Sequence, residues 1–143
     1  MNLFYGTAVA YCGFGVLIQG VSGSGKSDLA LRLIDDGADL IADDQVIIKA
    51  SEKGLHLSPP DSIAGLIEIR GFGVVKLEPV YEIPLYLLVK VNPTKQQKRM
   101  PKMKKKLIRN ISVPIININP FESSALAKIK IVLRYLDKNI ELI

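Results

Sequence analysis

Eight residues near the N-terminus match a phosphate-binding pattern at each of its fixed positions. The stretch is Gly20-Val21-Ser22-Gly23-Ser24-Gly25-Lys26-Ser27, which fits G-x-x-x-x-G-K-[ST]. Its glycines let the backbone approach a phosphate closely, and N–H groups at a helix N-terminus attract the anion. Lys26 can then reach the outer phosphates, and the Ser27 hydroxyl can ligate Mg²⁺. We expect Lys26 to face solvent until phosphate binds. A glycine- and serine-rich turn that fits the pattern by chance is the simpler alternative.

Acidic residues at the ends of later predicted strands add to this chemistry. Asp43 and Asp44 directly follow the apolar stretch Leu40-Ile41-Ala42. Neighbouring strands of an open α/β sheet deliver their carboxyl ends to one crevice. One aspartate could therefore help to hold Mg²⁺ while the other accepts a proton from an attacking hydroxyl. The alternative is that the pair only closes a turn.

A second pair of charged residues, Glu68 and Arg70, alternates along another predicted strand. Alternate residues of a strand point to the same face. A carboxylate and a guanidinium on one face suit a metal and a phosphate, but a structural ion pair has the same pattern. The spacing alone leaves both interpretations open.

The hydrophobic pattern predicts the elements that must position these residues. Residues 3–11 and 15–19 indicate a hairpin that turns at Cys12-Gly13. A helix is predicted over residues 28–36, with Gly37 at its C′ position. Further strands are predicted over residues 40–42, 45–50, 55–57, 66–70, 74–77, 85–91 and 113–118.

The C-terminal part predicts a second helix. In Asn119-Pro120-Phe121-Glu122, the types fit Asn at the N-cap, Pro at N1 and Glu at N3. An apolar stripe should pack this helix on the sheet; it comprises Phe121, Ala125, Ile129, Val132, Leu133 and Leu136. We therefore predict an α/β fold in one phosphate-loop domain spanning residues 1–143. It has a mixed β-sheet, an N-terminal hairpin, a helix after the loop and a C-terminal helix.

Length and composition agree with one domain. A chain of 143 residues can bury a substantial core. It has no apolar run long enough to span a bilayer and no signal-peptide pattern at residues 1–5. A single cysteine, Cys12, cannot form an internal disulfide. We expect a cytoplasmic protein without a membrane partner.

The charge is unevenly distributed. The chain has a formal net charge of +5, yet residues 83–121 contain basic residues and no acidic ones. This asymmetry predicts an anionic partner or ligand near residues 95–109. A nucleic-acid surface is disfavoured, because residues 95–109 contain no aromatic side chain on which bases could stack. We predict a mobile loop over residues 93–110.

Several stretches together resemble a known family. They are residues 15–18 leading into the loop, residues 25–31, residues 40–44, and Glu68-Ile69-Arg70-Gly71-Phe72-Gly73-Val74, which is similar to the signature E-[IV]-R-G-L-G-I. Over nearly its whole length the chain resembles the catalytic domain of the HPr kinase/phosphorylase family, serine kinases that act on the phosphocarrier protein HPr. It is most similar to short alphaproteobacterial forms, which lack an N-terminal domain and carry a segment like residues 119–122.

This resemblance implies roles for individual residues. The loop, residues 20–27, would hold ATP, with Lys26 on its phosphates and Ser27 on Mg²⁺. Asp44 would be the acid/base, taking the serine proton during phosphorylation and returning one during phosphorolysis. Asp43 remains a candidate metal ligand from the reasoning above.

The resemblance extends to three more charged residues and to assembly. Glu68 would be the second metal ligand, and Arg70 would belong to the signature loop. Arg99 falls where the family has a catalytic arginine. The family also suggests a homo-oligomer, a hexamer, with HPr as the protein partner.

Two departures from the family pattern weaken the phosphorylase assignment more than the kinase one. Tyr5, followed by Gly6, stands where the family has a histidine. Residues 116–120 replace a Pro-Gly-Arg-Asn-like loop of the longer members. A nucleotide-binding regulator without turnover is therefore the main alternative to an HPr kinase. A small-molecule kinase or another NTPase is a weaker alternative, because the Glu68–Val74 signature is not general among those enzymes.

Overall fold

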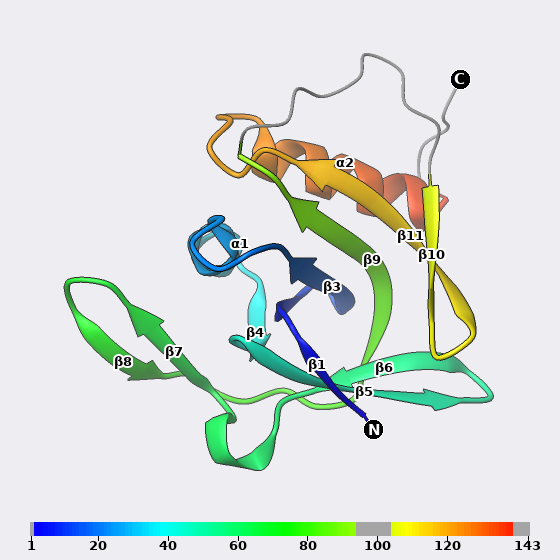
Figure 1. The fold of residues 1–143 in the computed structure, drawn as a ribbon, viewed down its shortest axis with the longest axis horizontal. Helices are drawn as coiled ribbons and strands as arrows, with labels where there is room; N and C mark the ends of the chain where they lie inside the picture. Colours follow the sequence, from blue (N-terminus) through cyan, green and yellow to red (C-terminus); the bar gives the residue numbers. More distant parts are fainter. Residues whose placement is uncertain (1, 94–103, 139–143) are drawn as a thin grey trace.

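The computed structural model describes residues 2–93 and 104–138, which form a curled mixed sheet with two helices (Figure 1). The first half of the chain contains β1 (Leu3–Tyr5), β2 (Thr7–Tyr11), β3 (Phe14–Gln19), α1 (Lys26–Asp35), β4 (Asp39–Ala42), β5 (Gln45–Ser51) and β6 (Gly54–Ser58). The second half contains a short 3₁₀ turn (Asp61–Ile63), β7 (Leu66–Ile69), β8 (Gly73–Lys76), β9 (Ile83–Val91), β10 (Lys104–Ile108), β11 (Ile111–Ile118) and α2 (Ala125–Leu136).

Strand β9 is the centre of the sheet. Along the path β1-β5-β6-β9-β3-β2-β4, it lies antiparallel to β6 and parallel to β3. Near its carboxyl end it also pairs in parallel with β11, which in turn pairs with β10. Strands β7 and β8 form a separate hairpin that projects from the main sheet (Figure 1). The predicted mixed α/β architecture is confirmed.

The N-terminal hairpin is present, but it is shorter than the pattern predicted. Strands β2 and β3 are antiparallel and turn at Cys12 and Gly13, both with positive φ (52° and 82°). Two such residues form the turn that suits the twist of a hairpin. The predicted run over residues 3–11 is divided at Gly6, whose φ is 153°. The piece before Gly6, β1, pairs with β5 instead.

Helix α1 ends as the sequence predicts. Gly37 takes a φ of 107° directly after the C-cap Asp36. The N–H of Gly37 donates to the Ile34 carbonyl, and that of Ala38 donates to the Leu33 carbonyl. This pair of bonds is a Schellman motif, which satisfies carbonyls at the helix end.

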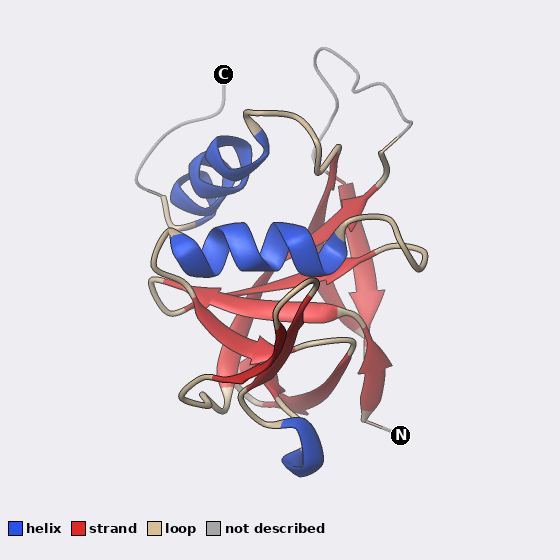
Figure 2. Cartoon of the chain, turned by 90° about the vertical axis from the view of Figure 1, so that its left-hand side faces the viewer, coloured by secondary structure: helices blue, strands red, loops and turns tan. Residues whose placement is uncertain are grey.

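Two apolar clusters lie on opposite faces of the sheet. On one face, Leu29 and Leu33 of α1 and Ile129 and Leu133 of α2 pack against β3 and β9. Figure 2 shows both helices on that side. The second cluster fills the curl of the sheet on the other face; it includes Leu17, Ile41, Ile48, Leu57, Leu88 and Val113. Because β3 and β9 are packed on both faces, they form a firm support for the loop that follows β3.

A polar cluster joins α1 to α2 and β2. The Asp36 carboxylate accepts hydrogen bonds from Lys130 Nζ (2.9 Å) and Tyr11 Oη (3.0 Å). These two donors, Lys130 first, lower the pKa of Asp36. The same bond raises the pKa of Lys130. Burial is the main cause of the raised pKa of Tyr11, followed by its bond to Asp36. Both partners of the ion pair thus hold their charges, and the pair joins the two helices.

The predicted loop over residues 93–110 is wrong for part of its length. Residues 104–108 form β10, which pairs with β11 through a turn at Arg109 and Asn110, both with positive φ (48° and 64°). A strand at the edge of a sheet tolerates lysines because their side chains can stay in water, and here residues 104–106 are exposed while Ile108 is buried. Residues 94–103 lie outside the described part of the chain.

The second helix begins later than predicted. Its N-cap is Ser124, and residues 119–122 form a turn instead of its first turn. Asn119 Oδ1 accepts the N–H of Phe121 at 3.0 Å, so the capping signature produces a local side-chain turn. Phe121 therefore does not join the apolar stripe, and it is 66% exposed. The remaining stripe residues do pack on the sheet.

Within residues 2–93 and 104–138, neither helix combines the length and the apolar character needed to cross a membrane.

Candidate functional site

The glycine-rich loop, residues 20–27, lies at the carboxyl edge of three parallel strands. Strand β3 leads into the loop, and β9 and β11 end beside it, because Gln19 pairs with Lys90 and Val91 pairs with Ile118. A Cβ added to Gly20 would lie 2.5 Å from Val91 Cγ2, so only glycine lets the loop pack this closely on β9. The ends of parallel strands are where α/β folds place ligands.

The loop delivers the open N-terminus of α1. Gly25 is the N-cap in the left-handed conformation (φ 101°), and no side chain caps the helix. The first N–H groups of an α-helix have no partner within the helix. They and the helix dipole attract an anion. Gly23 has a φ of 78°, and a Cβ added to it would have no atom within 4 Å, so the loop is open to solvent at this residue.

Two polar groups in the loop, those of Lys26 and Ser24, differ in their partners. Lys26 Nζ donates to the carbonyls of Gly20 (2.9 Å) and Val21 (3.1 Å), so Lys26, which was expected to face solvent, is half-exposed and folds back on the loop. An ammonium has three N–H donors and takes the nearest oxygens when no phosphate is present. Ser24 is only 2% exposed, and its buried hydroxyl has no hydrogen-bond partner among the described residues. A buried hydroxyl without a partner is costly, which marks this loop as prepared for a polar ligand.

The acidic turn after β4 is in direct contact with the loop. Strand β4 is separated from β3 by β2, but two antiparallel pairings make it run in the same direction as β3. Asp43 Oδ1 accepts the Ser27 hydroxyl at 2.9 Å. The same oxygen accepts the Thr7 hydroxyl at 3.1 Å. The predicted juxtaposition of Ser27 and Asp43 is thus present in the structure.

Thr7 is a residue of this site that sequence reasoning missed. It is fully buried at the start of β2, and it bonds both aspartates: its hydroxyl donates to Asp43 and accepts the N–H of Asp44 at 3.3 Å. A threonine hydroxyl can donate once and accept as well. The only signal in the sequence was a polar residue at the head of an apolar strand.

Asp44 is exposed beside this bonded group. Its backbone takes φ 73°, its carbonyl accepts the N–H of Gly6 at 2.9 Å, and among the described residues its carboxylate has no hydrogen-bond or ion-pair partner. Tyr5 precedes Gly6 and pairs with Gln45, the residue after Asp44; it is 74% exposed. The two aspartates therefore differ: Asp43 is held by hydroxyls, and Asp44 is free to meet a substrate.

The remaining predicted site residues are Glu68, Arg70 and Arg99. Glu68 is exposed on β7, and Arg70 is exposed in the turn between β7 and β8. Among the described residues, neither one forms an ion pair or hydrogen bond with Asp43, Asp44 or Ser27. Their hairpin projects on the same side of the molecule as the loop (Figure 1). Arg99 lies outside the described residues.

The donors present fit Mg²⁺ and a polyphosphate. Ser27 and Asp43 offer oxygen ligands, which a hard cation such as Mg²⁺ prefers, and Mg²⁺ commonly takes its other ligands from water and phosphates. Within the described ranges, no three His, Cys, Asp or Glu side chains gather to hold a metal by themselves. An ion that uses one hydroxyl, one carboxylate and a nucleotide is consistent with this donor set.

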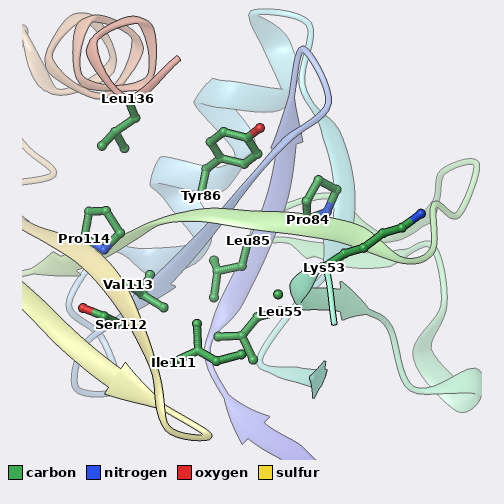
Figure 3. Close-up of a pocket in the computed structure, with 11 residues that line it drawn as sticks. Lys53, Leu55, Pro84, Leu85, Tyr86, Ile111, Ser112, Val113, Pro114 and Leu136 are labelled. Atoms are coloured by element: carbon green, nitrogen blue, oxygen red, sulfur yellow. The ribbon is translucent and has the colours of Figure 1, made fainter. Parts of the chain in front are cut away.

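Two cavities lie away from this site. One of about 360 Å³ is formed where β9 and β11 begin and α2 ends; Figure 3 shows Leu55, Leu85 and Ile111 gathered in it and Lys53 pointing away. Another of about 380 Å³ lies beside the Cys12 turn and α2. Both are at the opposite end of β3 from the loop, because Gly15 pairs with Leu85 there. We assign neither a part in phosphate chemistry.

The chain is similar in sequence to several known proteins. The chain is 42% identical over 86 residues to the HPr kinase/phosphorylase of Clostridium tetani, covering 60% of this chain and 28% of that protein. For the HPr kinase/phosphorylase of Chlorobium limicola the identity is 47% over 77 residues, covering 52% and 23%. The chain thus spans about a quarter of the length of these relatives.

A solved structure and a family model extend the likeness over most of the chain. The structure of the Hpr(Ser) kinase/phosphatase from Coxiella burnetii matches with a TM-score of 0.82 and 26% identity, over 96% of this chain and 92% of that one. The family model described as HPr Serine kinase C-terminal domain matches residues 2–132. The chain therefore belongs to the HPr Serine kinase C-terminal domain family.

Proposed function

We propose that residues 1–143 form a single kinase domain that transfers the γ-phosphoryl group of ATP to a serine of an HPr-type phosphocarrier in the cytoplasm. Slow reverse phosphorolysis and a homo-oligomeric state, a hexamer in the family pattern, belong to the same proposal. Membership of the family and the kinase names of the relatives support the reaction class.

One observation carries the proposal at the level of the site. The Ser27–Asp43 hydrogen bond of 2.9 Å connects the glycine-rich loop to the acidic turn, and Asp44 is exposed directly beside it. A phosphoryl-transfer enzyme needs a phosphate cradle, a metal ligand set and a base within one small region. This juxtaposition supplies candidates for all three.

Each residue then has a role in transfer. The N–H groups of the loop and Lys26 hold the phosphates, and Ser27 with Asp43 would hold Mg²⁺, which neutralises charge on the phosphates when bound. Asp44 accepts the proton of the acceptor serine hydroxyl. The serine oxygen forms a bond to the γ-phosphorus, the bond to the bridging oxygen breaks, and ADP leaves. Glu68 as a further metal ligand, and Arg70 and Arg99 as phosphate-facing cations, are part of the same proposal.

A regulator that binds nucleotide without turnover is the second candidate. Tyr5 is the observation that favours it: this exposed residue directly precedes Gly6, whose N–H bonds the Asp44 carbonyl, and the family pattern has a histidine at its position. A phenol cannot supply the positive charge of an imidazolium.

Intact-mass measurement separates the two candidates. The purified protein would be mixed with Mg-ATP and the phosphocarrier of its own organism, and the carrier would be weighed. We expect a gain of one phosphoryl group, and none on a carrier whose acceptor serine is replaced by alanine. Nucleotide binding with no gain in mass would favour the regulator.

The direction of the reaction depends on Tyr5. We expect phosphorylation of the carrier to be measurable and its dephosphorylation by inorganic phosphate to be slow. Tyr5→His should raise the reverse rate more than the forward rate, because a charged imidazole can support protonation of the leaving serine oxygen. Both rates would be measured on one preparation at saturating Mg²⁺. An equal change in both directions would make residue 5 a packing position on β1.

A further inference from the structure

The turn between β11 and α2 lies against the start of α1. A Cβ added to Gly25 would lie 2.9 Å from Pro120 Cγ and 3.6 Å from Phe121 Cζ. Figure 1 shows this orange turn on the same side of the molecule as the loop that leads into α1. The turn after β11 thus places Phe121 beside Gly25, the N-cap of α1 at the candidate phosphate site.

This turn is fixed by contacts within the protein. Asn119 Oδ1 accepts the N–H of Phe121, and the Asn119 carbonyl accepts the N–H of Glu122 at 3.2 Å. Arg32 of α1 donates from Nη2 to the Pro120 carbonyl, and Glu122 forms an ion pair of 2.6 Å with Lys128. Because the turn is held to both helices, the position of Phe121 is determined before any ligand binds, which lowers the entropy cost of binding.

The Phe121 ring itself is largely in water. Pro120 is buried against Gly25, whereas the next residue is 66% exposed. Single exposed apolar side chains are common on protein surfaces, but this one is aromatic, extends from a turn whose backbone is bonded on both sides, and borders the loop. Val21, the exposed apolar residue within the loop, is 77% exposed but has no flat face.

We propose that Phe121 is the stacking platform for the base of the nucleotide, so that residues 119–122 form a nucleobase subsite beside the glycine-rich loop. This inference rests on the proposed binding of ATP phosphates by that loop. A nucleoside triphosphate with its phosphates at the N-terminus of α1 extends its sugar and base beyond the loop, and Phe121 presents an exposed aromatic ring on the Gly25 side. Stacking reads the π-face of a base and not its edges, so adenine and guanine nucleotides should both use it.

Affinities for three probes test the subsite: Mg-ATP, Mg-GTP and Mg-tripolyphosphate, which carries the phosphates without a base. For Phe121→Ala we expect about a tenfold loss of affinity for ATP and GTP, within the range known for one stacked base. Its affinity for tripolyphosphate should match the parent protein. Phe121→Trp should keep nucleotide affinity, and Phe121→Leu should lose it as the alanine variant does.

Tyr81→Ala provides the matched control, since Tyr81 is 49% exposed just before β9, at the other end of that strand. It should bind all three probes like the parent. Unchanged ATP affinity in Phe121→Ala would overturn the subsite, as would an equal loss for tripolyphosphate, which would make the ring a support of the loop. A changed KM for the phosphocarrier with ATP affinity intact would also overturn it.

The subsite and the proposed reaction can fail separately. A parent protein that binds neither ATP nor tripolyphosphate overturns both. Absence of phosphoryl transfer, with ATP affinity still reduced in Phe121→Ala, overturns the kinase reaction and supports the subsite.

Discussion

Asp44→Asn is expected to lower phosphoryl transfer to the carrier by about 10²–10⁴-fold, the range for loss of a general base. The affinity for Mg-ATP should change little, because a base acts in the transition state and not in nucleotide binding. The structure supports this separation: within residues 2–93 and 104–138 the exposed Asp44 carboxylate has no hydrogen-bond or ion-pair partner, whereas the Asp44 backbone bonds Gly6 and Thr7. Replacement by asparagine preserves shape and keeps the turn.

Asp43→Asn is the matched comparison for this result. Its carboxylate accepts the Ser27 and Thr7 hydroxyls, so we expect the loss of charge there to raise the Mg²⁺ concentration needed for half-maximal rate. Asp44→Asn should leave that concentration unchanged. Steady-state rates over a Mg²⁺ titration, with ATP affinity measured separately, distinguish the two. A larger loss of rate in Asp43→Asn, at saturating Mg²⁺, would assign the base to Asp43.

Local patterns predicted the parts of the site that depend on local geometry. The glycine-rich loop, the helix after it and the Gly37 terminus lie within one continuous stretch of chain. Their conformations follow from glycine at positions of positive φ and from the 3.6-residue apolar period. Ser27 and Asp43 were placed together by a general rule about strand ends. That rule held even though β2 lies between the two strands.

Pairing between distant residues could not be predicted in the same way. Nothing in the sequence around Thr7 indicates that it would contact both aspartates, because that contact needs the register of β2 against β4. The basic residues 104–106 were predicted to lie in a loop for a related reason. A strand at the edge of a sheet has no apolar alternation when it exposes both faces.

The segment after β11 shows how one signal can serve two structures. Asn followed by Pro and an acidic residue fits a helix start, but the Asn119 side chain bonds the N–H of Phe121 and forms a separate turn. The pattern was right about a side-chain cap and wrong about what it caps, since α2 begins only at Ala125. The same local bond keeps Phe121 out of the core.

Lys26→Met should lower kcat/KM for ATP by about 10²–10³-fold, comparable with removal of one preorganised donor to a developing charge. Methionine keeps the length of the side chain and removes its three donors. In the structure the ammonium bonds the Gly20 and Val21 carbonyls, so it already lies within the loop and needs only to exchange those oxygens for phosphate oxygens.

The fold should survive this change, because both carbonyls belong to a loop at the protein surface and can be hydrated. Thermal unfolding checks that point, and kcat and KM for ATP measure the effect. Lys26→Arg is the control for charge: it keeps the positive charge, but its planar, wider head group does not reproduce a compact ammonium. We expect it to recover only part of the loss. Parental kcat/KM in Lys26→Met would place the triphosphate away from the glycine-rich loop. The proposed Mg²⁺ site at Ser27 and Asp43 would then have no phosphates beside it.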